Sequence, residues 1–224
     1  MTNVKHIFFD LDHTIWDFET NSNETLSELF LEFQLDKWID NKDRFLATYQ
    51  TVNAQYWKKY RDGKIDKHTV RFGRFPETLR RFKVDDPDKI GKDIGEEYIR
   101  RGPKKTNLFP HAHETLFYLS KKYPLHIITN GFKEVQYIKL GGSDLTKYFD
   151  IILCSEEVGV NKPHRKVFEA ALQKAKVDPI NSVMIGDNFE ADILGAQKVG
   201  MNTIFFDPNK TGKSNKSLLI HSLL

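Results

Sequence analysis

The sequence predicts an α/β fold, a doubly wound and mostly parallel sheet that carries an inserted helical domain. An apolar run at residues 7–9 predicts a buried first strand near the start of the chain. Between residues 106 and 207, β-branched or apolar runs alternate with amphipathic stretches of helical length. This alternation is typical of βαβ units, in which helices cover both faces of a parallel sheet. Residues from about 16 to 104 show helical spacing and no convincing strand.

Four later apolar runs each predict one further strand. They are Leu125–Thr129, Ile151–Ser155, Val183–Gly186 and Thr203–Phe206. Pro110 precedes one of the amphipathic stretches, and Pro163 opens another, as prolines often do in the first turn of a helix. Residues 217–224 fit either a final strand or a short helix, and the polar residues 211–215 predict a loop.

Within the insert, apolar residues recur at helical spacing. One series is Phe45, Tyr49, Val52 and Tyr56, and a second runs from residue 79 to residue 98. The pattern predicts about four helices packed as a small bundle. We therefore expect a Rossmann-like core at residues 1–15 and 105–224, with a helical cap domain at residues 16–104.

The composition excludes several classes of protein. With 39% hydrophobic residues in 224, the chain can fill a core, and a net charge of +3 is too small to indicate binding to a nucleic acid polymer. The single cysteine, Cys154, cannot form an intramolecular disulfide, and its apolar neighbours indicate a buried thiol. No stretch approaches the roughly 18 apolar residues of a membrane span, and we see no signal-like segment. We expect a cytoplasmic protein that does not bind membranes.

Two carboxylates, Asp10 and Asp12, directly follow the first predicted strand. Side chains two residues apart on an extended segment point the same way, so these two should crowd one spot. Like charges repel there unless a cation or a shared proton relieves them. The pattern favours a divalent metal, with one carboxylate as nucleophile and the other as proton carrier. A solvated Asp-x-Asp turn is the alternative.

Two further segments supply groups that bind phosphate. Thr129-Asn130-Gly131 ends a predicted strand with a hydroxyl, an amide and a glycine that allows close backbone approach, although an ordinary turn has the same sequence. Lys162 precedes Pro163 and would lie at the positive end of a helix dipole, which is unfavourable unless an anion binds there. An exposed surface lysine is the other interpretation.

The last segment adds acidic groups at the same edge of the sheet. Asp187 follows Gly186 at a strand end and offers a hard oxygen ligand, while Asp192 should lie in the next helix, around the metal but behind its direct ligands. Asp192 could equally stabilise the helix dipole. Four aspartates contribute −4 and Lys162 contributes +1, so a Mg²⁺ ion would leave the cluster nearly neutral and able to accept a phosphoryl group.

These segments, in this order, resemble the four motifs of the haloacid dehalogenase-like (HAD) superfamily of hydrolases. Residues 10–14 look like its first motif, Thr129 its second, Lys162 its third, and Asp187 with Asp192 its fourth. The helical insert is similar to the cap of that family. Residues 128–132, 155–163 and 56–75 resemble the noncanonical pyrimidine 5′-nucleotidase branch.

The resemblance implies a Mg²⁺-dependent phosphomonoester hydrolase that works through an aspartyl-phosphate on Asp10, with Asp12 as the proton carrier. The implied metal ligands are Asp10, Asp187 and, through its backbone carbonyl, Asp12; the implied phosphate-binding residues are Thr129, Asn130 and Lys162. The implied substrates are pyrimidine nucleoside monophosphates such as UMP, dUMP and dTMP. We expect the protein to bind this small phosphate ester as its only partner class and to be a monomer or a homodimer.

The residues that read the nucleoside are the least defined part of this hypothesis. Five candidates for base or sugar contacts are Trp16, Phe18, Trp57, Phe72 and Arg74, although aromatic residues at helical spacing are more often core. One departure from the family is His13, where glycine, aspartate or glutamate is more usual. We assign His13 no role.

Other functions are compatible with the same motifs. A phosphatase or phosphomutase acting on a sugar phosphate would keep both Asp10 and Asp12. A dehalogenase of this fold needs no metal and typically lacks the second aspartate, so Asp12 argues against it. A regulatory protein that binds phospho-ligands without turnover would not need every charged group that the motifs retain.

Overall fold

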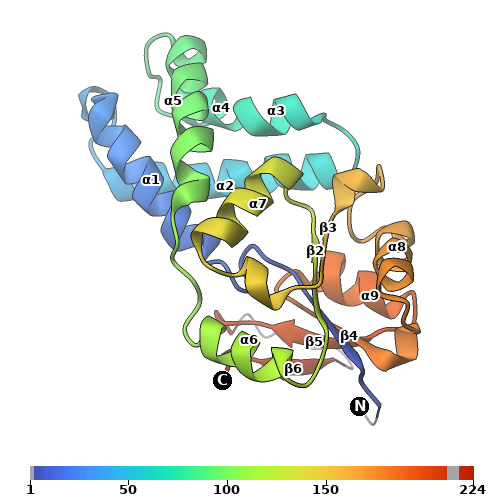
Figure 1. The fold of residues 1–224 in the computed structure, drawn as a ribbon. Helices are drawn as coiled ribbons and strands as arrows, with labels where there is room; N and C mark the ends of the chain where they lie inside the picture. Colours follow the sequence, from blue (N-terminus) through green and yellow to red (C-terminus); the bar gives the residue numbers. More distant parts are fainter. Residues whose placement is uncertain (1–2, 211–216) are drawn as a thin grey trace. The chain divides into compact units, whose positions relative to one another are not determined.

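The computed structural model describes residues 3–210 and 217–224. Its described residues divide into two compact units. The first unit contains the chain up to Phe18 and again from Thr106 onward, and the second is Glu19–Lys105 (Figure 1). Both chain termini therefore belong to the first unit, which holds every strand that the structure describes.

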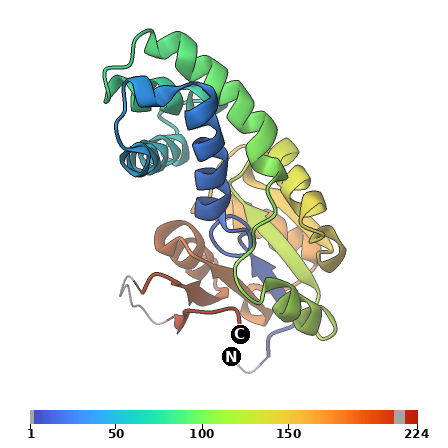
Figure 2. The same ribbon diagram turned by 90° about the vertical axis from the view of Figure 1, so that its left-hand side faces the viewer.

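The first unit is built on a parallel six-stranded sheet with the order β3-β2-β1-β4-β5-β6. Its strands are β1 (His6–Phe9), β2 (Leu125–Thr129), β3 (Ile151–Cys154), β4 (Ser182–Gly186), β5 (Asn202–Phe206) and β6 (Leu218–Ile220). All five pairings are parallel, which confirms the predicted fold class. β6 extends the sheet beyond β5, so residues 218–220 of the segment 217–224 form a strand, and none of that segment is helical (Figure 2). The predicted loop at 211–215 lies outside the described residues.

Helices cover both faces of this sheet. They are α6 (Ala112–Ser120), α7 (Lys133–Gly142), α8 (Arg165–Ala175) and α9 (Gly195–Gln197), with a π-helical segment at Phe189–Leu194 and 3₁₀ turns at Thr146–Tyr148, Ser155–Glu157 and Pro179–Asn181. Alternate residues of β1 point to opposite faces. Ile7 and Phe9 pack in the cluster that includes α6 and α7, whereas Phe8 packs in the cluster with α8 and α9. Because β1 is central and buried on both faces, its carboxyl end is rigidly supported.

One predicted helix start is wrong by two residues. Pro163 does not open α8, which begins at Arg165, with the His164 side chain accepting a hydrogen bond from the backbone N–H of Lys166. The helix begins later because His164 is in an extended conformation and serves as the N-cap. Lys162 therefore lies three residues before the start of the helix rather than directly before its first turn.

The second unit is helical, as the spacing predicts, and has five α-helices rather than about four. They are α1 (Phe18–Glu32, which starts in the first unit), α2 (Lys42–Arg61), α3 (Lys67–Phe72), α4 (Arg74–Arg80) and α5 (Pro87–Arg101), with 3₁₀ turns at Leu35–Lys37 and Gly102–Lys104. An aromatic-rich cluster forms its core and includes Phe45, Tyr49 and Tyr98. Side chains of Asn41 and Asp66 cap α2 and α3 by accepting backbone N–H groups.

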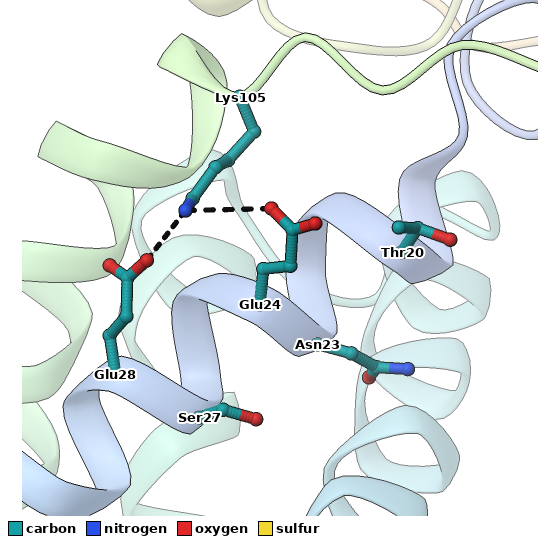
Figure 3. A pocket seen from close by; sticks show the side chains of 6 residues that line it. All are labelled: Thr20, Asn23, Glu24, Ser27, Glu28 and Lys105. Atoms are coloured by element: carbon teal, nitrogen blue, oxygen red, sulfur yellow. Dashed lines mark hydrogen bonds and ion pairs between the residues drawn. The ribbon is translucent and has the colours of Figure 1, made fainter.

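A polar pocket lies on α1 in the second unit. Lys105 donates a hydrogen bond of 2.6 Å to Glu28 and forms an ion pair of 3.5 Å with Glu24, and both contacts are drawn in Figure 3. The pocket is also lined by Thr20, Asn23 and Ser27. Lys105 thus partly neutralises the two glutamates, Glu24 and Glu28, on this helix. Among the described residues, no helix is long and apolar enough to cross a membrane.

Candidate active site

Three aspartates meet at the carboxyl edge of the sheet in the first unit. Asp10 follows β1, Asp187 follows β4, and Asp192 lies in the π-helical segment after it. One carboxylate oxygen of each lies within 4.8 Å of the others, a spacing that can hold a metal ion. Asp192 is 1% exposed and Asp10 is 8% exposed, so this is a buried concentration of negative charge. The structure thus brings together three of the residues that the motifs single out.

Lys162 supplies the opposite charge within this cluster. Its side chain is 2% exposed, and its ammonium lies 2.9 Å from Oδ1 of Asp10 and 2.7 Å from Oδ1 of Asp192. The same group donates a hydrogen bond of 2.6 Å to the carbonyl oxygen of Ile128 at the end of β2. Lys162 is therefore a buried, ion-paired cation and not an exposed surface lysine.

Local backbone chemistry positions the acidic groups. A Cβ atom on Gly186 would lie 2.4 Å from Oδ2 of Asp192, so only glycine lets Asp192 approach the end of β4. Oδ2 of Asp192 also accepts a hydrogen bond of 3.0 Å from the backbone N–H of Asn188. The buried hydroxyl of Thr14 accepts a hydrogen bond of 3.1 Å from the backbone N–H of Asp187 and donates to its Oδ1 at 3.3 Å.

The charges of the cluster do not balance. Three carboxylates face one ammonium, which leaves a formal excess of two negative charges in a buried site. Burial raises the pKa of Asp10 to about 8, with Lys162 opposing the shift, and burial together with Asp192 raises the pKa of Asp187 to about 8. Burial would lower the pKa of Lys162, but Asp10 and Asp192 raise it above its usual value. Hard oxygen donors with two surplus negative charges fit Mg²⁺.

The side chain of Asp12 does not belong to the cluster of Asp10, Asp187 and Asp192. It contacts two residues of α7 that were not predicted from the sequence. Its Oδ1 contacts the ammonium of Lys139, and its Oδ2 accepts a hydrogen bond of 3.0 Å from Nε2 of Gln136. Gln136 and Lys139 are buried on the same helix face as Leu140. Polar residues placed on the buried stripe of a helix were the signal available in the sequence.

The phosphate-binding candidates also have defined partners. The Thr129 hydroxyl accepts a hydrogen bond of 3.0 Å from the backbone N–H of Gly131. The side chain of Asn130 accepts from the backbone N–H of Lys162 at 2.8 Å and donates to its carbonyl at 3.1 Å. This side chain therefore holds the Lys162 loop against the end of β2, a role that the sequence did not predict.

The five candidates for nucleoside contacts divide between the units. Trp16 is 2% exposed, and its ring lies 4.1 Å from the ammonium of Lys139; Phe18 packs against the same core cluster. Trp57 and Phe72 are partly exposed in the second unit. Arg74 is 6% exposed in the interior of that unit.

His13 has a left-handed backbone conformation, with φ of 63°. Glycine adopts this conformation without strain, which explains physically why glycine suits this position. Histidine is among the residues that adopt it more often than most. Its ring lies 4.8 Å from that of Phe18, between ring centroids.

Comparisons with known proteins agree with this geometry. The model of the haloacid dehalogenase-like hydrolase family matches residues 7–206. The chain is 33% identical over 202 residues to the pyrimidine 5′-nucleotidase YjjG of Escherichia coli strain K12, covering 90% of this chain and 85% of that protein. It is 39% identical over 215 residues to a glyceraldehyde 3-phosphate phosphatase of Pyrococcus furiosus, covering 94% and 83% respectively.

A solved structure extends the similarity to three dimensions. The HAD-hydrolase YfnB of Bacillus subtilis, in a crystal structure bound to magnesium, aligns with a TM-score of 0.89 at 27% identity. The alignment covers 99% of this chain and 96% of that one. Taken with the buried aspartate cluster and its lysine, these findings identify the chain as a member of the haloacid dehalogenase-like hydrolase family.

Proposed function

We propose that this protein is a Mg²⁺-dependent phosphomonoester hydrolase whose preferred substrates are pyrimidine nucleoside 5′-monophosphates. The observation that carries the proposal is the buried cluster of Asp10, Asp187 and Asp192 around Lys162. The similarity to YjjG, a pyrimidine 5′-nucleotidase, supports the substrate class. The magnesium in the YfnB crystal structure supports the choice of metal.

In the proposed reaction, a carboxylate oxygen of Asp10 attacks phosphorus and forms an aspartyl-phosphate, while the bond to the ester oxygen breaks. Asp12 gives a proton to that oxygen as the alcohol leaves. A water molecule then attacks the phosphorus of the intermediate, Asp12 takes its proton, and inorganic phosphate leaves as the Asp10 carboxylate is restored.

The remaining groups bind and neutralise. Mg²⁺ would be held by the carboxylates of Asp10 and Asp187 and by the backbone carbonyl of Asp12. Asp192 would lie behind these direct ligands. When bound, Mg²⁺ would neutralise charge on the phosphoryl oxygens. Lys162 would stabilise the same oxygens with its buried ammonium, and the Thr129 hydroxyl and Asn130 backbone would donate to them. We assign selection of the nucleoside to the second unit, where Trp57 and Phe72 are partly exposed.

A panel of phosphate esters with and without Mg²⁺ tests this proposal. It should include UMP, dUMP and dTMP, their purine counterparts, and glyceraldehyde 3-phosphate. We expect phosphate release that requires Mg²⁺ and is fastest with a pyrimidine nucleotide. No release from any ester would refute the hydrolase, whereas release without added metal in the presence of EDTA would refute the metal requirement.

A second candidate is a phosphatase for a small sugar or triose phosphate. The 39% identity to the glyceraldehyde 3-phosphate phosphatase of Pyrococcus furiosus favours it. The same panel separates the two, because a higher kcat/KM for glyceraldehyde 3-phosphate than for every pyrimidine nucleotide would replace the nucleotidase and keep the hydrolase.

A further inference from the structure

The carboxylate of Asp12 is held at both oxygens by one face of α7. The ammonium of Lys139 contacts Oδ1, and the amide of Gln136 donates a hydrogen bond of 3.0 Å to Oδ2. A carboxylate with a separate donor on each oxygen has a fixed plane, because rotation about its Cβ–Cγ bond would break both contacts. Asp12 is thus oriented before any substrate arrives.

Lys139 is itself immobilised. Its side chain is 5% exposed, and its ammonium lies 4.1 Å from the centre of the Trp16 ring and 5.5 Å from that of Phe18. Burying an ammonium is costly unless a negative charge and aromatic faces compensate. A lysine that served only α7 would place its charge in solvent, as Lys133 does with 51% of its side chain exposed.

Gln136 depends on the turn that follows β2. The residue is 1% exposed, and a Cβ atom on Gly131 would lie 1.7 Å from its Nε2. The glycine of the Thr129-Asn130-Gly131 turn therefore leaves the space that the amide occupies beside Asp12. The two buried lysines divide the site, because Lys162 contacts Asp10 and Asp192 while Lys139 contacts Asp12.

We propose that Lys139 and Gln136 are positioning residues that orient Asp12 for proton transfer to and from the ester oxygen. The inference rests on the proposed hydrolase function and adds two residues to it. Neither residue needs to touch the substrate. Their loss should therefore act only on the steps in which Asp12 moves a proton.

The dependence on the leaving group isolates this role. An aryl ester such as p-nitrophenyl phosphate leaves readily without a proton, whereas an alkyl ester needs one. The alkyl ester would be UMP or glyceraldehyde 3-phosphate, whichever the wild type hydrolyses faster. The value of kcat/KM reports the steps up to departure of the alcohol, so the aryl ester should be insensitive to Asp12 in this parameter.

For Lys139→Met we expect kcat/KM for the alkyl ester to fall about 10- to 100-fold, and that for p-nitrophenyl phosphate to change less than about 3-fold. Hydrolysis of the intermediate also needs Asp12, so the variant should release a burst of p-nitrophenol before steady state. Lys139→Arg should restore most of the alkyl-ester activity. The matched control on the same helix, Lys133→Met, should leave both esters unchanged.

Two further variants keep the test decisive if Lys139→Met does not fold. Gln136→Met should show the same split between esters with a smaller loss. Adding Gln136→Met to Asp12→Asn should cost less than about 3-fold more, since the group being positioned is already absent. An equal loss of kcat/KM on both esters, or full additivity of the losses with Asp12→Asn, would overturn the positioning role while the hydrolase stands. A wild type that hydrolyses neither p-nitrophenyl phosphate nor any ester of the panel would overturn the hydrolase, and this inference with it.

Discussion

Both units of the molecule bury cations, and the charges of Lys162 in the first unit and Arg74 in the second are neutralised in different ways. In the first unit, Lys162 lies between Asp10 and Asp192. In the second, Arg74 contacts the faces of Tyr49, Phe75 and Tyr98 at 5.2–5.9 Å and donates to the amide oxygen of Asn53. Among the described residues, no carboxylate lies within ion-pair distance of Arg74.

The difference separates a reactive site from a packed interior. Aromatic faces and one amide can hold a guanidinium without any surplus charge, so Arg74 needs no ligand to be stable. With all three carboxylates ionised, the Lys162 cluster would carry two surplus negative charges, and the raised pKa values of Asp10 and Asp187 reflect the cost of that ionisation. Binding of a dication therefore stabilises the ionised cluster. We therefore assign the chemistry to the first unit and a packing role to Arg74.

The largest expected effect is on turnover. Asp10→Asn removes the proposed nucleophile and should lower kcat by at least about 10³-fold at saturating Mg²⁺, with a cooperative thermal transition retained. Arg74→Met should leave kcat within about 5-fold, because the comparison gives Arg74 a packing role. Both are measured by phosphate release from the best substrate. Substantial residual activity in Asp10→Asn would contradict covalent catalysis by this residue.

Removing each buried cation should lower the free energy of unfolding, and the loss should be larger for Lys162 than for Arg74. Lys162→Met leaves the carboxyl groups of Asp10 and Asp192 without their cation and should lower the free energy of unfolding by about 3 kcal/mol near neutral pH. Arg74→Met loses cation–π contacts and leaves only the Asn53 carbonyl without its donor, a cost of about 1–2 kcal/mol. Denaturant unfolding without metal measures both. A larger loss of unfolding free energy for Arg74→Met than for Lys162→Met would contradict the different roles assigned to the two cations.

The pH dependence of the metal-free protein follows from the raised pKa values of Asp10 and Asp187. Both lie near 8 in the folded protein, above the usual value of 3.8, so folding favours the protonated forms. This contribution is complete below about pH 4 and is lost as the pH rises through about 8. Mg²⁺ competes with these protons, so it should raise the melting temperature more at about pH 9 than at about pH 6.

Asp187→Asn is the control for this titration, because it removes one of the two raised groups. The melting temperature of this variant should depend less on pH between about 6 and 9 than that of the wild type, and Mg²⁺ should raise the variant's melting temperature less. A wild type that becomes more stable across this range without metal would show that the two carboxylates are not held protonated.

The smallest expected effects compare packing at two helical glycines, one in each unit. A Cβ atom on Gly141 in α7 would meet nothing within 4 Å, so Gly141→Ala should stabilise the protein by about 0.5–1 kcal/mol through helix propensity. A Cβ atom on Gly91 in α5 would lie 2.6 Å from the backbone nitrogen of Pro76 in α4, so Gly91→Ala should destabilise it by about 1–3 kcal/mol. Thermal unfolding measures both; equal effects would contradict the close packing of α4 on α5.

The strands could be predicted well because their signal is local. Each is a short apolar run that ends in polar residues, and Leu125–Thr129 agrees with the structure at both ends. The start of α8 could not be predicted as well, because either Pro163 or His164 could have preceded its first turn. The fifth helix of the second unit was missed because a helical pattern does not reveal every break between short helices such as α3 and α4.

The acidic residues of the site could be predicted because parallel strands present their carboxyl ends at one edge. What the spacing could not predict was the partner of each side chain. The side chain of Asn130 hydrogen-bonds the backbone of Lys162, and the carboxylate of Asp12 contacts Lys139 and Gln136 on α7. Such pairings depend on how helices pack over the sheet, and that information is not local in the sequence.

The most direct test of the central claim is to trap the intermediate. The wild type with Mg²⁺ and its best ester would be quenched in acid within one turnover, digested, and examined by mass spectrometry. We predict a phosphoryl group on the peptide that contains Asp10, absent from Asp10→Asn and from a sample without Mg²⁺. Efficient turnover in the wild type and in Asp10→Asn alike, with no modified peptide at any quench time, would contradict the account.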